Sequence, residues 1–388
     1  MITKLNLISN YTQIFNEKPK YTFFAPGRIN LIGEHTDYNG GHVFPAAISL
    51  GIYAAVGPRD DDQLWAFSQN LAEKGCLKTS LSDLRFDEKA DWLNYFRGMT
   101  FFFAQKGIHL SHGFNLYIQA DLPASSGLSS SAAMSMLAAK IIMTLTKKTL
   151  DPLDVVKMGQ RVENDYLGYH TGIMDEFAIM FGRHDQAIFL DTNKLDYHYF
   201  PLKLTDHAIL IMNTNKPRNL ITSKYNERQE ECQKALTRLQ QKLNIKNLCD
   251  LTPEQLDENA YLIDDDRLLK RAKHVIWENA RTITAKKAMT DGDLSRFGRL
   301  MNASHVSLKY DYDVTGPELD TLVETAWQQK GVLGARMTGA GFGGCALALV
   351  ETDAVSDLKA AIRDAYVKRI GYEPSFYLTH LSDGPQIW

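Results

Sequence analysis

The stretch GFNLYIQADLP, residues 113–123, runs directly into ASSGLSSSAAMSMLAAKIIMTLTKK, residues 124–148. The first part predicts an extended strand, and the Ala, Met, Leu and Ile residues of the second part favour a helix. A glycine and serine loop lies between them, so the pattern predicts a strand, a loop and a helix in immediate succession. This junction guides the rest of the interpretation, because such a loop presents backbone N–H groups to a ligand.

The loop at residues 123–133, PASSGLSSSAA, is a candidate phosphate site. Backbone N–H groups of the loop and of the first helical turn converge where the helix dipole is positive, which stabilises an anion. The hydroxyls of Ser129, Ser130 and Ser131 add hydrogen bonds or a magnesium ligand. The loop lacks the GxxxxGK[ST] pattern and therefore has no P-loop lysine. A serine-capped helix after a glycine turn is the structural alternative.

The length and composition narrow the class of protein. At 388 residues the chain is too long for one average domain, so we expect two domains that meet at a cleft. Hydrophobic residues make up 44% and charged residues 23% of the chain, both ordinary for a globular protein. The formal charge of -3 gives no indication of a nucleic acid or membrane partner.

The cysteines and the N-terminus indicate the cellular compartment. The four cysteines are far apart and form no CxxC pattern, which indicates reduced thiols and no structural zinc site. The N-terminus, MITKLNLISNYTQIF, has no basic segment followed by an apolar core, and no run of about 18 apolar residues occurs. We therefore expect a cytoplasmic enzyme or binding protein.

A second polar stretch, GRINLIGEHTDYNGG at residues 27–41, follows the apolar segment YTFFAP. It concentrates Glu34, His35 and Asp37 in one short run. A metal site needs defined ligand spacing on a regular element, and one histidine between two acids is weak support for it. An ionised carboxylate accepts hydrogen bonds from two vicinal hydroxyls, so the cluster suits a sugar. A solvated turn is the structural alternative.

Residues 339–344, GAGFGG, match the letters of the GxGxxG dinucleotide pattern. In a dinucleotide site the glycines open a helix after a strand, whereas here CALALV follows and predicts a strand. We therefore reject a Rossmann interpretation. The glycines allow two backbones to approach closely, line the floor of a site, or form a glycine-rich turn.

Glu163 and Asp175 are the acids that we single out in RVENDYLGYHTGIMDEF, residues 161–177. Apolar residues flank Asp175 on both sides, which predicts a partly buried carboxylate that needs a partner. Arg28, in the stretch at residues 27–41, is the candidate partner. A surface carboxylate is the alternative for either acid.

Together these segments resemble the galactokinases, members of the GHMP superfamily of small-molecule kinases. GRINLIGEHTDYNGG is similar to the galactokinase signature, PASSGLSSSAA to the superfamily phosphate loop P-x-x-x-G-L-x-S-S-A, and GIMDEF to the catalytic segment. Further matches are NTN at 213–215, KYNER at 224–228, SHVSLKYDYDV at 304–314 and RMTGAGFGG at 336–344. The resemblance covers nearly the whole chain, and its motifs occur in the order of the family.

The resemblance implies an α/β (α+β) fold of two GHMP-type domains with mixed sheets and an active site in the cleft between them. The sequence changes from strand-rich to helix-rich near residue 190, so we place the N-terminal domain at residues 1–190 and the C-terminal domain at residues 191–388. The N-terminal domain then carries the sugar signature and the phosphate loop.

The implied reaction is ATP-dependent phosphorylation of the C1 hydroxyl of D-galactose to galactose 1-phosphate, the first step of galactose catabolism by the Leloir pathway. The resemblance makes Asp175 the catalytic base and Arg28 the cation beside it. The sugar ligands that it implies are Glu34, His35, Asp37, Gly172, Asp175 and Tyr225. The implied partners are the sugar and ATP, and no oligomer is implied, which is consistent with a monomer.

The resemblance also implies sites for ATP and Mg²⁺. Ser131 and Glu163 are the implied magnesium ligands. Trp92 and Tyr95 stand in the positions of the family's adenine contacts, although a core stripe at i and i+3 is the alternative for them. The residues implied to contact ATP are Ser68, Trp92, Tyr95, Ser125, Ser126, Gly127, Leu128, Ser129, Ser130 and Ser131.

Four positions depart from the family pattern. Glu176 follows the implied base where galactokinases usually have glutamine, so a second acid is expected beside Asp175. Ala340 replaces a glycine, Pro217 stands where a basic residue is common, and Gln229 stands where arginine is usual. None of these departures removes a residue that the resemblance assigns to catalysis.

Two rival functions remain open from the sequence. One is a GHMP kinase for a related substrate such as N-acetylgalactosamine. The other is a sensor that binds galactose and ATP and regulates a partner without turnover. Such sensors lack residues after the serine run of the phosphate loop, whereas Ser131 and Ala132 are in place here.

Overall fold

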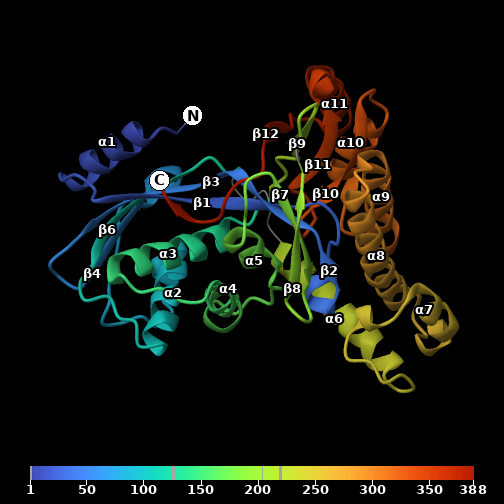
Figure 1. The fold of residues 1–388 in the computed structure, drawn as a ribbon, viewed down its shortest axis with the longest axis horizontal. Helices are drawn as coiled ribbons and strands as arrows, with labels where there is room; N and C mark the ends of the chain where they lie inside the picture. The colour runs from blue at the N-terminus through green and yellow to red at the C-terminus, as the bar shows by residue number, and fades with distance from the viewer. Residues whose placement is uncertain (1, 124–126, 203, 218–220) are drawn as a thin grey trace.

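The computed structural model describes residues 2–123, 127–202, 204–217 and 221–388, without the side chains of residues 221–223. The described strands are β1 (Tyr21–Asn30), β2 (His42–Val43), β3 (Pro45–Pro58), β4 (Gln63–Ser68), β5 (Leu77–Ser80), β6 (Phe114–Ala120), β7 (Gln186–Asp191), β8 (Asp196–Pro201), β9 (His207–Asn213), β10 (Val332–Thr338), β11 (Cys345–Glu351), β12 (Ser375–Thr379) and β13 (Gln386–Ile387). They form a six-stranded sheet in the order β13-β1-β3-β6-β4-β5, a three-stranded sheet, β2-β7-β8, and a four-stranded sheet, β10-β11-β9-β12 (Figure 1).

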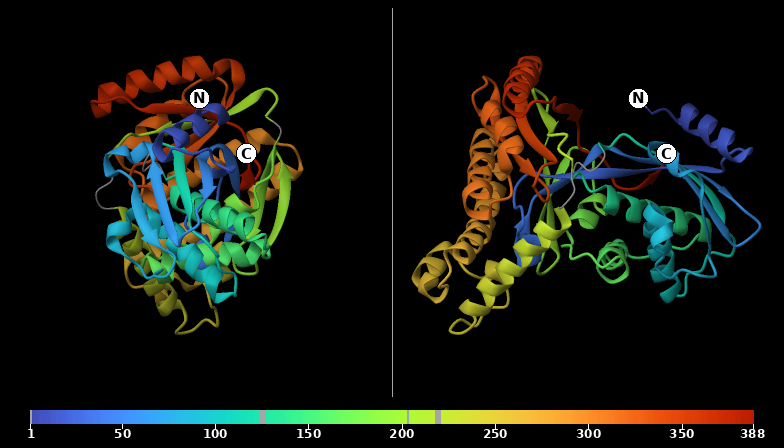
Figure 2. Two further views of the ribbon diagram at one scale, coloured as in Figure 1. Left: turned by 90° about the vertical axis from the view of Figure 1, so that its left-hand side faces the viewer. Right: turned by 180° about the vertical axis from the view of Figure 1, so that it is seen from behind.

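Helices pack against all three sheets, which confirms the predicted α/β (α+β) class. The α-helices in the described part of the chain are α1 (Lys4–Phe15), α2 (Asn94–Gln105), α3 (Ser130–Thr146), α4 (Pro152–Arg161), α5 (Met174–Met180), α6 (Ile221–Leu239), α7 (Pro253–Asn259), α8 (Asp266–Thr290), α9 (Leu294–Ser307), α10 (Gly316–Trp327) and α11 (Val355–Ile370). The long helices α8 and α9 stand side by side at the end of the molecule away from α1 (Figures 1 and 2).

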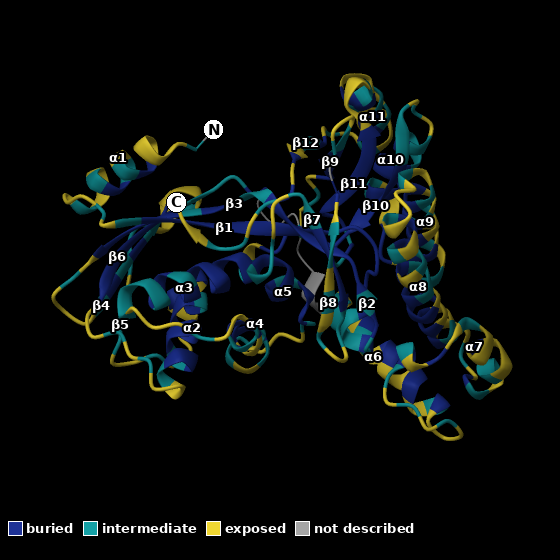
Figure 3. Cartoon of the chain, viewed as in Figure 1, coloured by how far each residue is buried: buried dark blue, intermediate teal, exposed yellow. Residues whose placement is uncertain are grey.

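The six-stranded sheet is covered on one face by α2 and α3 and on part of the other face by α1 (Figure 2). Successive side chains of a strand point to opposite faces, so neighbours in β3 enter different cores. Ala54 and Val56 join the large core beneath the sheet, whereas Ala55 packs with Leu7 and Tyr11 of α1. The helices thus bury most of β1, the strand that leads into residues 31–41 (Figure 3).

The four-stranded sheet is buried on both faces. Ile209 and Ile211 of β9 pack into the same core as Phe297 of α9, while Leu210 and Met212 pack on the other face toward α10 and α11. Burial on both faces explains why HAILIMN and CALALV are nearly continuous apolar runs without polar alternation.

Two glycines bring α9 into direct contact with β10. A Cβ atom on Gly298 would lie 2.1 Å from the carbonyl oxygen of Leu333, and one on Gly334 would lie 2.3 Å from the carbonyl oxygen of Gly298. Both contacts are with backbone atoms, which have no rotamer to change. The close approach of helix and strand therefore requires glycine at both positions.

Chain connections cross the predicted domain boundary at residue 190. Strand β7 pairs with β8 through Leu190 opposite Tyr197 and Asp191 opposite Asp196. Strand β13, near the C-terminus, returns to pair with β1, with Ile387 opposite Phe23 (Figure 1). The division into residues 1–190 and 191–388 stays a prediction.

Several sequence predictions about local structure are confirmed. The junction at residues 113–148 forms β6, a loop and α3, and the GAGFGG segment leads into the strand β11 and not into a helix. The structure describes the loop except for residues 124–126.

One finding stands apart from these predictions: among the described residues, no helix is both long and apolar enough to cross a membrane.

We predict that Gly298→Ala destabilises the fold although alanine favours a helix by about 1 kcal/mol over glycine. The added methyl group clashes with the Leu333 carbonyl, and overpacking of this kind costs about 1–3 kcal/mol. Chemical unfolding should show a net loss of up to about 2 kcal/mol. Gly98→Ala in α2 is the matched control, because its Cβ meets side-chain atoms of Val162 and Tyr166 at 3.0 Å or more. A Gly298→Ala protein more stable than wild type would contradict the prediction.

Candidate active site

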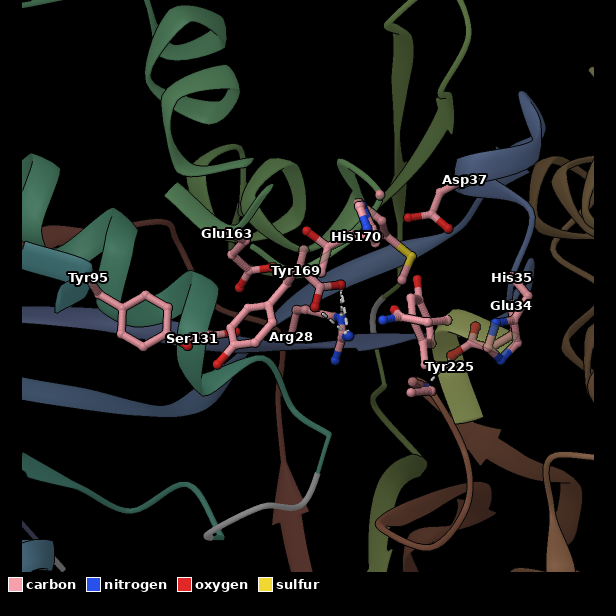
Figure 4. A pocket seen from close by; sticks show the side chains of 17 residues that line it. Arg28, Glu34, His35, Asp37, Tyr95, Ser131, Glu163, Tyr169, His170 and Tyr225 are labelled. Atoms are coloured by element: carbon pink, nitrogen blue, oxygen red, sulfur yellow. Dashed lines mark hydrogen bonds and ion pairs between the residues drawn. The ribbon is translucent and has the colours of Figure 1, made fainter. Parts of the chain in front are cut away.

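A pocket opens where β1, the start of α3, the start of α5, α6 and the loop between β10 and β11 meet (Figure 4). Its walls come from segments that are far apart in the sequence. The lining residues are Arg28, Glu34, His35, Asp37, Tyr95, Ser131, Glu163, Tyr169, His170, Thr171, Gly172, Met174, Asp175, Tyr225, Asn226, Gly339 and Ala340.

Arg28 and Asp175 form a bidentate ion pair near the middle of the pocket. The Arg28 Nε and Nη2 atoms donate to the two carboxylate oxygens of Asp175, each at 2.8 Å. Arg28 is buried with 4% of its surface exposed, whereas the Asp175 side chain keeps 29% exposure. The sequence-based prediction of this partner is confirmed, and the carboxylate retains access to the pocket.

The same ion pair contacts the glycine and serine loop before α3. Arg28 Nη1 donates to the carbonyl of Gly127 at 2.6 Å, and Ser129 Oγ donates to Asp175. The backbone N–H of Arg28 also donates to the carbonyl of Leu128 at 3.2 Å. A Cβ on Gly27 would lie 2.8 Å from that carbonyl, so the strand approaches the loop closely because residue 27 is a glycine.

The N-terminus of α3 points toward the pocket without a side-chain cap from Ser129. Ser129 is the N-cap residue in the left-handed backbone conformation, with φ of 61°, and its hydroxyl bonds Asp175 instead of the helix. A helix leaves its first N–H groups without intrahelical partners, so they are available to an anion. The side chain of Ser129 therefore does not cap α3, in contrast to the structural alternative of a serine-capped helix.

Glu34 is almost completely buried, with 1% of its surface exposed. Its carboxylate accepts from the Asn30 side-chain amide, the backbone N–H of Gly339 and Arg336 Nη1, the last at 3.2 Å. Burial raises the pKa of Glu34, while the charge of Arg336 and the Gly339 N–H act in the opposite direction. Gly339 lies in the loop between β10 and β11, so this loop forms part of the pocket.

Glu278 of α8 holds the backbone of the segment that carries Glu34. Its Oε1 atom accepts from the backbone N–H of Gly33 at 2.9 Å and of Glu34 at 3.3 Å. Burial alone would raise the pKa of Glu278, but the charges of Arg281 and Arg336 lower it to about 2. The carboxylate is therefore ionised and pairs with the fully buried Arg336, whose Nη2 atom lies 3.9 Å away.

Four more residues of the predicted sugar site meet beside this cluster. Burial lowers the pKa of His35 well below its usual value, and burial together with the Asp175 charge raises the pKa of Asp37 to about 7. The Tyr225 and His35 rings lie 5.8 Å apart. A Cβ on Gly172 would lie 1.7 Å from Asp37 Oδ2, so position 172 admits glycine alone in this arrangement.

Glu163 and Ser131 lie together on the other side of the pocket. Glu163 belongs to a π-helical turn, Val162–Tyr166, and is buried. Burial raises its pKa, while hydrogen bonds from Ser131 and Thr171 act in the opposite direction. Mg²⁺ at phosphate sites usually takes one or two protein ligands and completes its shell with phosphate and water oxygens. The Glu163 carboxylate and the hydroxyl of Ser131, which lies at the start of α3, fit such an ion.

A protein-only metal cage does not occur in the described part of the chain. No group of three or more His, Cys, Asp and Glu side chains there is arranged to hold a metal ion. Among the described residues, Glu34, His35 and Asp37 are therefore not part of such a group.

Glu176, the departure beside the predicted base, is fully buried and does not belong to the described pocket lining. Neither of its carboxylate oxygens has a hydrogen-bond partner among the residues that the structure describes, and a Cβ on Gly159 would lie 2.8 Å from its Cγ atom. Burial and the nearby Glu163 raise its pKa well above the usual value. This environment favours the uncharged carboxyl, so Glu176 adds little negative charge beside Asp175.

The structure brings most of the predicted site residues together. Ten of them line the pocket: Arg28, Glu34, His35, Asp37, Tyr95, Ser131, Glu163, Gly172, Asp175 and Tyr225. Gly127 and Ser129 contact the ion pair at the pocket, Leu128 is buried in the core and Ser130 is exposed.

The remaining predicted nucleotide contacts lie elsewhere or outside the described residues. Ser68 and Trp92 are buried and do not belong to the described lining, and Trp92 packs edge-on against Phe96. Ser125 and Ser126 lie outside the residues that the structure describes. The role of each of these residues in binding ATP stays a prediction.

Sequence reasoning missed the residues that support the pocket from behind. Arg336 lies in the RMTGAGFGG segment, which is similar to a family motif, but the resemblance implies no role for this residue. Glu278 lies in HVIWENAR, which has the pattern of an ordinary amphipathic helix, so no local signal marks it. Tyr169, His170 and Asn226 line the pocket and were also not singled out.

Comparisons with known families agree with this fold and site. The galactokinase galactose-binding signature matches residues 9–58, the GHMP kinase N-terminal domain matches residues 94–183, and the GHMP kinase C-terminal domain matches residues 285–368. The mevalonate kinase of Methanococcus jannaschii, at 20% identity, superposes with a TM-score of 0.66 over 93% of this chain and 98% of its own. The fold and the site thus define a kinase of the GHMP class.

Relatives of higher sequence identity show which family of GHMP kinases the chain belongs to. The chain is 55% identical to the galactokinase of Levilactobacillus brevis over 98% of each chain, and 52% identical to that of Ligilactobacillus salivarius over 97% of each. A crystal structure of Lactococcus lactis galactokinase complexed with galactose superposes with a TM-score of 0.96 at 46% identity over 100% of both chains. The chain belongs to the galactokinase family.

We predict that Arg336→Leu destabilises the fold by about 3–5 kcal/mol, because it removes the paired cation of the buried Glu34 carboxylate. Glu278 also loses Arg336 but keeps its ion pair with Arg281 at 2.8 Å. Urea unfolding at neutral pH measures the loss. Arg85→Leu is the matched control, since Arg85 and Asp83 form an exposed ion pair, with 86% and 51% of the side chains accessible. The control should leave stability nearly unchanged. Equal stability of the two variants would show that the buried cluster does not hold the fold.

Proposed function

We propose that this protein transfers the γ-phosphoryl group of ATP to the C1 hydroxyl of D-galactose in the cytoplasm, as the first step of galactose catabolism. One observation carries the proposal. Asp175 lies between the acids at residues 34–37 and the uncapped start of α3, and Arg28 holds it in a bidentate ion pair. Membership of the galactokinase family supports galactose as the sugar.

The sugar binds beside Glu34, His35 and Asp37, with the Tyr225 ring and the Gly172 backbone closing the pocket. Carboxylate oxygens accept hydrogen bonds from hydroxyls, and several acceptors at fixed positions distinguish sugars by hydroxyl orientation. Glu34 is held by three donors and cannot swing away without leaving a buried charge unpaired. This rigidity gives selectivity between galactose and glucose, which differ in the orientation of the C4 hydroxyl.

Asp175 receives the C1 hydroxyl of the sugar and accepts its proton as the oxygen attacks the γ-phosphorus of ATP. Phosphoryl transfer depends mainly on in-line positioning and on stabilising charge at the phosphoryl oxygens. Arg28 fixes the orientation of the Asp175 carboxylate through two hydrogen bonds and places a positive charge beside the transferred group. The hydroxyl of Ser129 also holds the carboxylate in place.

The phosphates of ATP bind at the start of α3, where the N–H groups of the first turn and the helix dipole favour negative charge. Ser131 and Glu163 are the residues that would hold Mg²⁺, and the bound ion would neutralise charge on the β- and γ-phosphates. Residues of the loop at 127–129 contact the ion pair of Arg28 and Asp175, which supports binding of the phosphates next to the sugar.

We predict that Asp175→Asn lowers kcat for galactose by at least about a hundredfold, the range expected for loss of a general base. The amide keeps the shape of the side chain and removes its ability to accept the proton. ADP release from ATP and Mg²⁺ measures turnover. Glu176→Gln is the matched control, because Glu176 is buried without a partner and should give a kcat within about twofold of wild type. Near-wild-type turnover by Asp175→Asn would exclude the base role.

The same assay with a panel of substrates tests the proposed sugar. Galactose should be phosphorylated and glucose should not, with 2-deoxygalactose, talose, N-acetylgalactosamine and mevalonate as the other substrates. Turnover of N-acetylgalactosamine above that of galactose would favour the related sugar kinase. Binding of galactose without turnover of any substrate would favour a sensor.

Galactose affinity should depend on pH through Asp37, whose pKa is raised to about 7. The carboxylate is mostly ionised above this pH and mostly protonated below it, and the ionised form accepts from two sugar hydroxyls. Affinity should therefore fall about tenfold from about pH 8 to about pH 6. Isothermal titration calorimetry checks this, and Asp37→Asn should give a flat profile. A pH dependence that persists in Asp37→Asn would assign the effect to another group.

A further inference from the structure

His35 has one ring nitrogen bound and one without a partner. Its Nδ1 atom lies 2.7 Å from the hydroxyl of Tyr38, whereas the buried Nε2 atom makes no hydrogen bond of good geometry within the described residues. The backbone of Ala340 lies near enough to the ring to act against the lowering of the His35 pKa. A neutral imidazole carries one proton, so the nitrogen that holds it decides whether Nε2 donates or accepts. The partner of Nδ1 therefore sets what His35 offers to a ligand.

Tyr38 is the first member of a hydrogen-bonded chain that leads away from the pocket. The Tyr38 hydroxyl lies 2.8 Å from the hydroxyl of Tyr312, and the Tyr312 hydroxyl lies 3.1 Å from Sγ of Cys232. Tyr312 ends the π-helical turn Leu308–Tyr312, and Cys232 belongs to α6. The chain thus joins His35 to two elements outside the sugar-binding segment.

Burial, a backbone hydrogen bond and two ring contacts fix the position of Tyr312. It is fully buried, its carbonyl accepts from Arg228 Nε at 2.9 Å, and its ring packs on that of His35 with centroids 4.7 Å apart. On its other side the His274 ring lies at 4.5 Å. The hydroxyl of Tyr312 is therefore fixed in position by contacts of both the backbone and the ring.

All four groups of the chain are uncharged at neutral pH. Burial lowers the pKa of His35, raises the pKa of Tyr38 and Tyr312, and raises that of Cys232 to about 11. Each group then carries one mobile proton, and the protons can be ordered in one of two directions along the chain. The direction decides the tautomer of His35.

The two directions differ in the acceptor at the end of the chain. In one, Cys232 donates to Tyr312, Tyr312 to Tyr38, and Tyr38 to Nδ1 of His35. In the other, Nδ1–H donates toward Tyr38 and the chain ends on the sulfur of Cys232. An imidazole nitrogen is a good acceptor, whereas a thiol sulfur is a weak one. The first direction is therefore the more stable, and it places the imidazole proton on Nε2.

We infer that Tyr312, acting through Tyr38, is a positioning residue that holds His35 in the Nε2–H tautomer. The inference rests on the proposed function, in which His35 lies against the sugar. His35 then donates a hydrogen bond to one galactose oxygen, while the carboxylates of Glu34 and Asp37 accept from hydroxyls. One donor among acceptors fixes the orientation of the sugar more narrowly than acceptors alone, because a reversed sugar would leave the N–H unpaired.

The tautomer is measured directly in the sugar-free wild-type protein by ¹⁵N NMR of histidine-labelled enzyme. Loss of one imidazole signal pair in His35→Gln assigns the resonances. We expect a protonated Nε2 and an unprotonated Nδ1 for His35. A protonated Nδ1 would overturn the inference whatever the protein binds, because this measurement needs no substrate.

Binding of galactose to Tyr312→Phe tests the consequence for recognition. Loss of one neutral hydrogen bond in the chain should weaken galactose about fivefold by isothermal titration calorimetry, with kcat within about twofold of wild type. The ¹⁵N spectrum should show a mixture of the two His35 tautomers. Tyr11→Phe is the matched control, since Tyr11 is equally buried and donates to Glu17 at the far side of the sheet. It should leave galactose affinity unchanged.

Monodeoxygalactoses separate positioning from a purely structural role. If Tyr312 acts through His35 on one oxygen, the affinity lost in Tyr312→Phe should vanish for the one deoxygalactose that lacks this oxygen and persist for the others. An equal loss for every analogue, or no loss at all, would overturn the inference. If Tyr312→Phe does not fold, Tyr38→Phe gives the same comparison, because it removes the partner of Nδ1 directly.

Failure of the proposed function would look different. In that case wild-type protein would neither bind nor phosphorylate galactose, and the NMR result on His35 would still decide the tautomer. A wild type that phosphorylates galactose with His35 protonated at Nδ1 would keep the proposed function and reject the inference.

Discussion

The ion pair between Arg28 and Asp175 is the contact on which the rest of the site depends. Arg28 comes from β1, Asp175 from the start of α5, and the same guanidinium holds the carbonyl of Gly127 in the loop before α3. One buried cation therefore joins the strand that leads to the sugar segment, the phosphate loop and the helix that carries the proposed base. A buried arginine needs such partners, since an unpaired charge in this position would be strongly destabilising.

The two ends of the pocket are stabilised in different ways. At the sugar end, buried charges compensate one another, because Arg336 lies between the carboxylates of Glu34 and Glu278. At the phosphate end, the first turn of α3 leaves N–H groups for a ligand, and Glu163 is buried beside Ser131. The charges at the sugar end thus compensate one another within the protein, whereas at the start of α3 the N–H groups favour an anionic ligand, as the proposed binding of ATP requires.

The sequence predicted the local parts of this arrangement well. Strand, loop and helix at residues 113–148 follow from residue types that act over a few positions. The flanking apolar residues of Asp175 correctly indicated a partly buried acid with Arg28 as its partner. Glu278 could not be predicted, because it meets residues 33–34 only through the fold of the whole chain. The sequence also predicted a second acid beside Asp175, but burial favours the uncharged carboxyl of Glu176, which has no hydrogen-bond partner among the described residues.

A crystal structure with galactose and a non-hydrolysable ATP analogue tests the central claim, that Asp175 is the point where sugar and phosphate meet. The measurement is the distance from the C1 oxygen of galactose to the nearer carboxylate oxygen of Asp175. We expect a hydrogen bond of about 2.6–3.2 Å, with the C1 oxygen facing the γ-phosphate. A sugar bound with C1 toward Glu34 and away from Asp175 would contradict the account.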